Sequence, residues 1–200
     1  MPSTTCAKSP AICVFSVRIP EECKMPVISV FGSSAPRPGS ADYELARQMG
    51  ALLAEAGFTV QTGGYSGVME AASRGAAEAG GHVIGVTCAQ IEAFRPLPAN
   101  RWVAEEIKQA TLRERVLYLV EHCDGAIVMP GGIGTLSELA LMWSLMQVGD
   151  IPRRPFIAVG GLWARTLNAF IDPAYIQPEY AALIQLARTP REAIALLRSA

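Results

Sequence analysis

The chain has 200 residues, of which 50% are hydrophobic and 18% are charged, and its formal net charge is -1. This composition predicts one compact domain with a continuous core, and the lack of a basic stripe argues against nucleic acid or an anionic membrane as partners. The five cysteines include no CxxC pair and form neither a disulfide framework nor a zinc site, so we expect a cytoplasmic protein that holds no metal.

Residues 1–24 differ from the rest of the chain. They contain three of the five cysteines and two of the three lysines, and their short apolar run lies between two prolines. Met25 and Pro26 are then followed directly by a strand-like segment. We therefore expect residues 1–24 to be a loosely ordered extension and residues 25–200 to form the folded domain.

From Val27 onward, short apolar runs alternate with longer helical patterns, which is typical of a parallel sheet with helices on both faces. The sequence therefore predicts a single doubly wound α/β domain of the Rossmann-like class. In chain order we expect a strand at 27–31, a helix at 41–56, a strand at 58–61, a helix at 67–79, a strand at 82–87, a loop at 94–100, a helix at 111–121, a strand at 126–129, a helix at 134–148, a strand at 156–159 and helices at 163–171, 179–188 and 190–199.

Two details of this assignment depend on single residues. The segment 102–110 is compatible with a helix or a short strand, and we favour a strand that ends near Gln109. Thr111 is a possible N-cap of the following helix.

In doubly wound folds, ligands bind at the carboxyl ends of the strands, and three predicted strand ends carry glycine turns. The turn after 126–129 is the clearest, because three glycines let the backbone approach a phosphate closely. The glycines of the second turn could equally well bind a phosphate or allow a tight bend from strand to helix. The two serines of the first turn could donate hydrogen bonds to an anion or could simply begin the following helix. The turns contain Ser33 and Ser34; Gly63, Gly64 and Gly67; and Gly131, Gly132, Gly134 and Thr135.

Glu138 is the only charged residue between Asp124 and Asp150. A buried carboxylate needs a cation, a hydrogen-bonding ligand or a catalytic role, since burying it unpaired costs several kcal/mol. Arg115 lies at the border of the apolar stripe of its helix, where its side chain either reaches a cleft or extends to water. The segment 139–148 is apolar on nearly all sides, so it is either wholly buried or shared with a second subunit, and we expect a homodimer.

The segment from Pro130 to Glu138 matches the PGGxGTxxE signature of the LOG (Lonely Guy) family of Rossmann-like proteins. Three further motifs resemble the same family over about residues 26–172. They are Gly32-Ser33-Ser34, the turn Gly63-Gly64-x-x-Gly67-x-Met69, and the pair Glu114-Arg115.

The resemblance implies a homodimer that hydrolyses the N-glycosidic bond of a purine, cytokinin-type nucleoside 5′-monophosphate without a metal or cofactor. It implies Arg115 and Glu138 as the catalytic pair. The implied phosphate and nucleotide contacts are Ser33, Ser34, Gly63, Gly64, Gly67, Met69, Gly131, Gly132, Gly134 and Thr135.

Three residues depart from the cytokinin-releasing pattern: Thr62, Glu70 and Val116. They make the chain more similar to a branch with a TGGxxGVMEA turn, which also includes carrier proteins for the molybdenum cofactor. A second hypothesis is therefore a carrier that holds a phosphorylated cofactor without turning it over.

Overall fold

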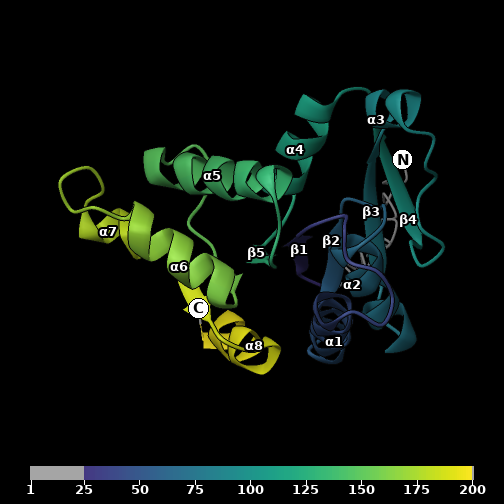
Figure 1. Cartoon of the computed structure of the whole chain (residues 1–200), viewed down its shortest axis with the longest axis horizontal. Coiled ribbons are helices and arrows are strands. Elements are labelled where there is room, and N and C mark those ends of the chain that lie inside the picture. The colour runs from purple at the N-terminus through teal and green to yellow at the C-terminus, as the bar shows by residue number, and fades with distance from the viewer. Residues whose placement is uncertain (1–24, 200) are drawn as a thin grey trace, which may run out of the picture.

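Seven parallel strands form one sheet in the order β4-β3-β2-β1-β5-β6-β7 (Figure 1). The computed structural model describes residues 25–199, so the expected extension over 1–24 lies outside the described residues. The chain first builds the sheet outward from β1 to β4 and then returns to the other side of β1, where it begins again with β5. The strands are β1 (Val27–Phe31), β2 (Thr59–Thr62), β3 (Val83–Cys88), β4 (Glu105–Gln109), β5 (Gly125–Val128), β6 (Phe156–Val159) and β7 (Gln185–Ala187).

Helices cover both faces of this sheet (Figure 1). One face carries α1 (Ala41–Glu55), α2 (Val68–Glu78) and α8 (Pro190–Ser199), and the other carries α4 (Leu112–Glu121), α5 (Ile133–Val148) and α6 (Gly161–Phe170). Two short helices, α3 (Ala89–Phe94) and α7 (Pro178–Ala181), bury no side chain. The doubly wound α/β prediction is confirmed.

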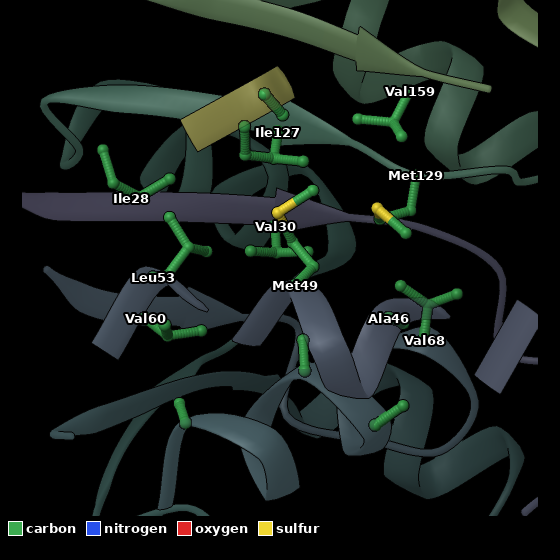
Figure 2. Packing of buried hydrophobic residues seen from close by; sticks show 14 of the residues in the cluster. Ile28, Val30, Ala46, Met49, Leu53, Val60, Val68, Ile127, Met129 and Val159 are labelled. Carbon is green, nitrogen blue, oxygen red and sulfur yellow. The ribbon is translucent and has the colours of Figure 1, made fainter. Parts of the chain in front are cut away.

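Alternating strand residues divide the core between the two faces. Ile28 and Val30 of β1 pack with Met49 and Val68 of α1 and α2, as Figure 2 shows. Phe31 points to the opposite face and joins the cluster under α4, α5 and α6. Because each fully buried large apolar side chain contributes about 1.5–3 kcal/mol, both clusters are needed to hold the strand ends in place.

The helices at the carboxyl edge of the sheet begin where the sequence predicted. The Ser40 hydroxyl accepts a hydrogen bond from the Tyr43 amide at the start of α1. Thr111 forms a complete capping box with Glu114, so the expected N-cap of α4 is confirmed. Such caps satisfy amides that the helix leaves unpaired and contribute about 1 kcal/mol each.

Within the segment 102–110, residues Glu105–Gln109 form the short strand β4, which ends at Gln109 as expected. The predicted helix over 179–188 is wrong, because only Pro178–Ala181 is helical and Gln185–Ala187 forms β7. The reason is tertiary: β7 pairs with β6 at the sheet edge, and the Gly160 amide donates to the Ala187 carbonyl at 2.9 Å. Helix α3 was not predicted.

Helices α1 and α2 pack so closely that two glycines lie between them. A Cβ at Gly75 would overlap the carbonyl oxygen of Arg47, and one at Gly50 would overlap that of Ala72. Overpacking of this kind costs about 1–3 kcal/mol. We expect Gly75→Ala to lower the free energy of unfolding by about that amount in urea denaturation.

The matched control is Gly134→Ala in α5, where a Cβ would meet no atom within 4 Å. This variant is expected to keep the wild-type free energy of unfolding or to exceed it, because alanine favours the helix. Equal stability of the two variants would contradict the close-packing argument.

Candidate active site

The switch point between β1 and β5 brings the three glycine turns together. The Ser33 amide donates to the Pro130 carbonyl at 3.2 Å, which joins the turns after β1 and β5. The Val68 amide donates to the Ser33 carbonyl at 2.8 Å, which adds the turn after β2. Gly67 has a φ of 74°, and a Cβ there would overlap Ser33 and Ser34. The three turns therefore form one continuous surface at the carboxyl edge of the sheet.

A cavity of about 290 Å³ opens between these turns and helix α4. Most of the predicted site residues line this cavity. Gly32 and Ile133 line it as well and were not among the predicted contacts; Gly32 belongs to the first glycine turn, and Ile133 lies between Gly132 and Gly134, which is the signal that could have identified it. Gly63, Gly64, Gly67 and Gly131 lie outside its lining. The lining residues are Gly32, Ser33, Ser34, Met69, Arg115, Gly132, Ile133, Gly134, Thr135 and Glu138.

The N-terminus of α5 forms one wall of this cavity. Its N-cap is Gly132, which offers no side chain to the first amides, and the first turn contains no acidic residue. Neither Gly132 nor Gly134 has a positive φ, and a Cβ at either would meet no atom within 4 Å. The fold itself therefore does not require glycine at these positions. Because neither glycine has a side chain, the uncapped amides of the helix stay accessible, which is the arrangement that binds phosphate at helix N-termini.

Gly131 and Thr135 pack against each other at the base of this turn. A Cβ at Gly131 would overlap the Thr135 side chain, which is itself buried. Gly131 is thus needed for packing, whereas Thr135 reaches the cavity.

Arg115 turns into the fold rather than out to water, with an exposed fraction of 6%. Its Nε donates to the Val86 carbonyl at 2.7 Å, and its Nη2 donates to the Gly63 carbonyl at 2.9 Å. Met69 Sδ lies 3.6 Å from the same Nη2. A Cβ at Gly63 would overlap the guanidinium, so Gly63 acts by admitting Arg115. Charge-assisted bonds to two fixed carbonyls hold the guanidinium in one orientation at the cavity edge.

Glu138 projects from α5 into the same cavity with an exposed fraction of 8%. Within residues 25–199 its carboxyl group makes no hydrogen bond or salt bridge. Burial raises the pKa of Glu138 from 4.5 to about 7, and the positive charge of Arg115 partly counteracts this rise. The carboxyl group is therefore buried, has no hydrogen-bond or salt-bridge partner among the described residues, and is near the balance of its two protonation states at neutral pH.

This perturbed pKa makes stability depend on pH. Between pH 4.5 and about 7 the unfolded chain releases the Glu138 proton while the folded protein keeps it. The contribution of Glu138 to the free energy of unfolding therefore falls as pH rises through that window. The window of roughly 2.5 pH units corresponds to about 3 kcal/mol.

We expect Glu138→Gln to lack this loss, so that the variant gains on the wild type by about 3 kcal/mol between pH 4.5 and 7. Urea denaturation at a series of pH values measures the difference. Parallel stability curves for the two proteins would contradict the raised pKa.

In residues 25–199, no helix is both long and apolar enough to cross a membrane. Over the same residues, no three His, Cys, Asp or Glu side chains come together as a metal site would require.

Comparison with known proteins identifies relatives of two kinds. Residues 25–148 match the model of the SLOG cluster4 family. A cytokinin riboside 5′-monophosphate phosphoribohydrolase of Mycobacterium tuberculosis is 32% identical over 158 residues, which cover 76% of this chain and 82% of the relative. The enzyme of that name designated LOG3 in Arabidopsis thaliana is 29% identical, with coverage of 87% and 82%.

Among solved structures, the molybdenum cofactor binding protein of Rippkaea orientalis matches with a TM-score of 0.70 and 28% identity, covering 88% of this chain and 98% of that protein. The molybdenum cofactor carrier protein of Chlamydomonas reinhardtii matches with a TM-score of 0.68 and 25% identity at the same coverage. Since the family model spans most of the folded chain and its glycine turns converge at one cavity, the chain belongs to the LOG family, in its SLOG cluster4 group.

Proposed function

We propose that this protein hydrolyses the N-glycosidic bond of a purine, cytokinin-type nucleoside 5′-monophosphate to give the free base and ribose 5-phosphate. The proposal rests on the environment of the Glu138 carboxyl group. A carboxyl group that is buried, unpartnered within the described chain and raised in pKa to about 7 lies in the same cavity as an open helix N-terminus. Groups in such environments are typical of active sites.

In this proposal the 5′-phosphate is bound at the amides of Gly132 and Gly134. The positive end of the α5 dipole and the absence of an acidic residue in its first turn favour an anion there. Ser33, Ser34 and Thr135 line the same cavity and supply hydroxyl donors. Anchoring the phosphate would orient the ribose, which lowers the entropic part of the barrier.

The chemical step breaks the bond between ribose C1′ and the base nitrogen, and a water oxygen bonds to C1′. Positive charge develops on the ribose as the base leaves, and an ionised Glu138 would stabilise it. The carboxylate would accept one proton from the attacking water, whose other hydrogen stays on the new C1′ hydroxyl group, and the proton held by Glu138 would then pass to the departing base nitrogen. Arg115 would favour the ionised form of Glu138, in line with the direction of its effect on that pKa.

The direct test incubates the purified protein with AMP and with isopentenyladenosine monophosphate. Chromatography should show free base and ribose 5-phosphate in equal amounts. Binding of either nucleotide without any release of base would contradict the hydrolase and favour the second candidate.

That second candidate is a carrier for a phosphorylated cofactor such as the molybdenum cofactor. The likeness to the Rippkaea orientalis protein supports it, as do Thr62, Glu70 and Val116. None of these three residues lines the cavity, however, and the Thr62 hydroxyl is bonded within the fold to the Gly64 amide at 3.1 Å. Mass spectrometry of ligand retained through purification separates the candidates, because a carrier should keep a pterin and a hydrolase should not.

We also propose that the protein acts as a homodimer through α5. One side of this helix is buried and contains Leu139, Met142 and Trp143. The other side carries Ile133 and Leu136, which have exposed fractions of 80% and 39%. Because Ile133 also lines the cavity, a second copy seated on this face would border the site. Exposed apolar side chains in such a patch are typical of an interface.

We expect the wild type to elute at about twice its monomer mass of 21.3 kDa in light-scattering chromatography, and Leu136→Asp to elute as a monomer. The matched control is Leu186→Asp on β7, where the leucine has a nearly equal exposed fraction of 40%. A monomeric wild type, or equal effects of the two substitutions, would contradict this interface.

A further inference from the structure

A second cavity adjoins the candidate active site, and its lining includes both Ser33 and Pro130, whose amide and carbonyl are hydrogen-bonded to each other. Its volume is about 570 Å³, against about 290 Å³ for the first. Ser33 lines both cavities, and Gly131 in the second cavity directly precedes Gly132 in the first. A phosphate bound at Gly132 would therefore lie where the two cavities meet.

The chemistry of the second cavity differs from that of the first. Its lining includes Arg37, an exposed cation that forms no salt bridge within residues 25–199, and Asp42 in the first turn of α1. Leu162, at the start of α6, adds an apolar surface. A guanidinium without a carboxylate partner suits a phosphoryl group, and a carboxylate suits the hydroxyl pair of a sugar.

Size also favours a ligand that extends across both cavities. Pockets for small ligands usually measure about 300–1,000 Å³. The volume of the first cavity alone lies just below this range, while the volumes of the two cavities together fall well within it. A nucleoside monophosphate would leave the larger cavity and its cation unused.

We propose, on the basis of the hydrolase function above, that the crevice binds a nucleoside 5′-diphosphate that carries a sugar. The first phosphoryl group is held at the amides of Gly132 and Gly134. The second phosphoryl group extends past Ser33 toward Arg37. The sugar at the outer end places its hydroxyl groups against Asp42.

The test compares AMP, ADP and ADP-glucose as ligands of the full-length Glu138→Gln variant by calorimetry, because this variant should bind the nucleotides without cleaving them. Chromatography checks that each ligand stays intact, the substitutions below are made in the same background, and the wild type is assayed in parallel for cleavage. ADP and ADP-glucose should each bind at least about tenfold more tightly than AMP, because each gains a charge-assisted contact. Arg37→Ala should remove most of this gain and change the Kd for AMP less than about twofold. The matched control is Arg191→Ala, which replaces an exposed arginine of α8 and should change none of the three values.

Two further variants probe the outer part of the cavity. Leu162→Glu places a carboxylate in the first turn of α6, where negative charge favours the helix, and it should weaken the binding of ADP-glucose. Urea denaturation of this variant checks that it is folded. Asp42→Asn should weaken the binding of ADP-glucose but not the binding of ADP.

The outcomes separate this inference from the proposed function. If AMP binds and is cleaved while ADP and ADP-glucose bind no better, or if Arg37→Ala weakens all three ligands equally, the second cavity is not a subsite and the hydrolase proposal stands. If none of the three nucleotides binds, both proposals are overturned.

Discussion

Glu138→Gln is expected to lower kcat for base release from AMP by about 10²–10⁴, the usual contribution of a general acid or base. Glutamine has nearly the same shape but carries no charge, so it can neither stabilise positive charge on the ribose nor accept a proton from water. The loss should come without unfolding. Glu138 makes no hydrogen bond or salt bridge within the described residues, and its burial penalises the charged form, so the variant should be at least as stable as the wild type near pH 7.

Three measurements together decide the role of this carboxylate: kcat, the Kd for AMP and the free energy of unfolding. We expect only kcat to fall, since the proposed phosphate contacts at Gly132 and Gly134 are unchanged. Glu121→Gln is the matched control, because this exposed carboxylate of α4 lies outside the cavity lining. A Glu138→Gln variant that keeps more than about a tenth of the wild-type kcat would contradict the mechanism.

Sequence patterns predicted the parts of this protein that depend on local structure. The isolation of Glu138 in an apolar segment pointed to a buried carboxyl group, because ionisable side chains are rarely buried without a partner or a role. The short apolar runs predicted the central strands, since a parallel sheet buries both faces of each strand.

Other features depend on contacts between distant segments, and no local pattern contains them. Arg115 appeared on the border of its helix stripe, but its orientation is set by the carbonyls of Val86 and Gly63 on neighbouring strands. The sequence was compatible with Gly63 in a phosphate site or in a tight bend, and it did not show that the missing side chain makes room for that guanidinium. β7 was mistaken for helix because a three-residue edge strand is fixed by pairing with β6 and not by its own periodicity.

Arg115→Met is expected to change both the stability of the fold and the titration of the site. The substitution removes two charge-assisted hydrogen bonds to buried carbonyls, each of which usually contributes about 1.5–3 kcal/mol. Since such contributions are not fully additive, we expect the free energy of unfolding to fall by about 3 kcal/mol. Urea denaturation measures this loss, and Arg113→Met, which replaces an exposed arginine of the same helix, should be nearly neutral.

The second effect of Arg115→Met separates a catalytic role from a purely structural one. The charge of Arg115 lowers the pKa of Glu138, so removing it should raise that pKa further above 7. Because the proposed mechanism needs the ionised carboxylate, the rising limb of the pH–rate profile should move to higher pH in the variant. Arg115→Lys keeps the positive charge but loses the pair of hydrogen bonds to the two carbonyls. This variant should therefore be less stable than the wild type, but its pH–rate profile should move less than that of Arg115→Met. An unchanged profile in Arg115→Met would show that the guanidinium supports only the fold.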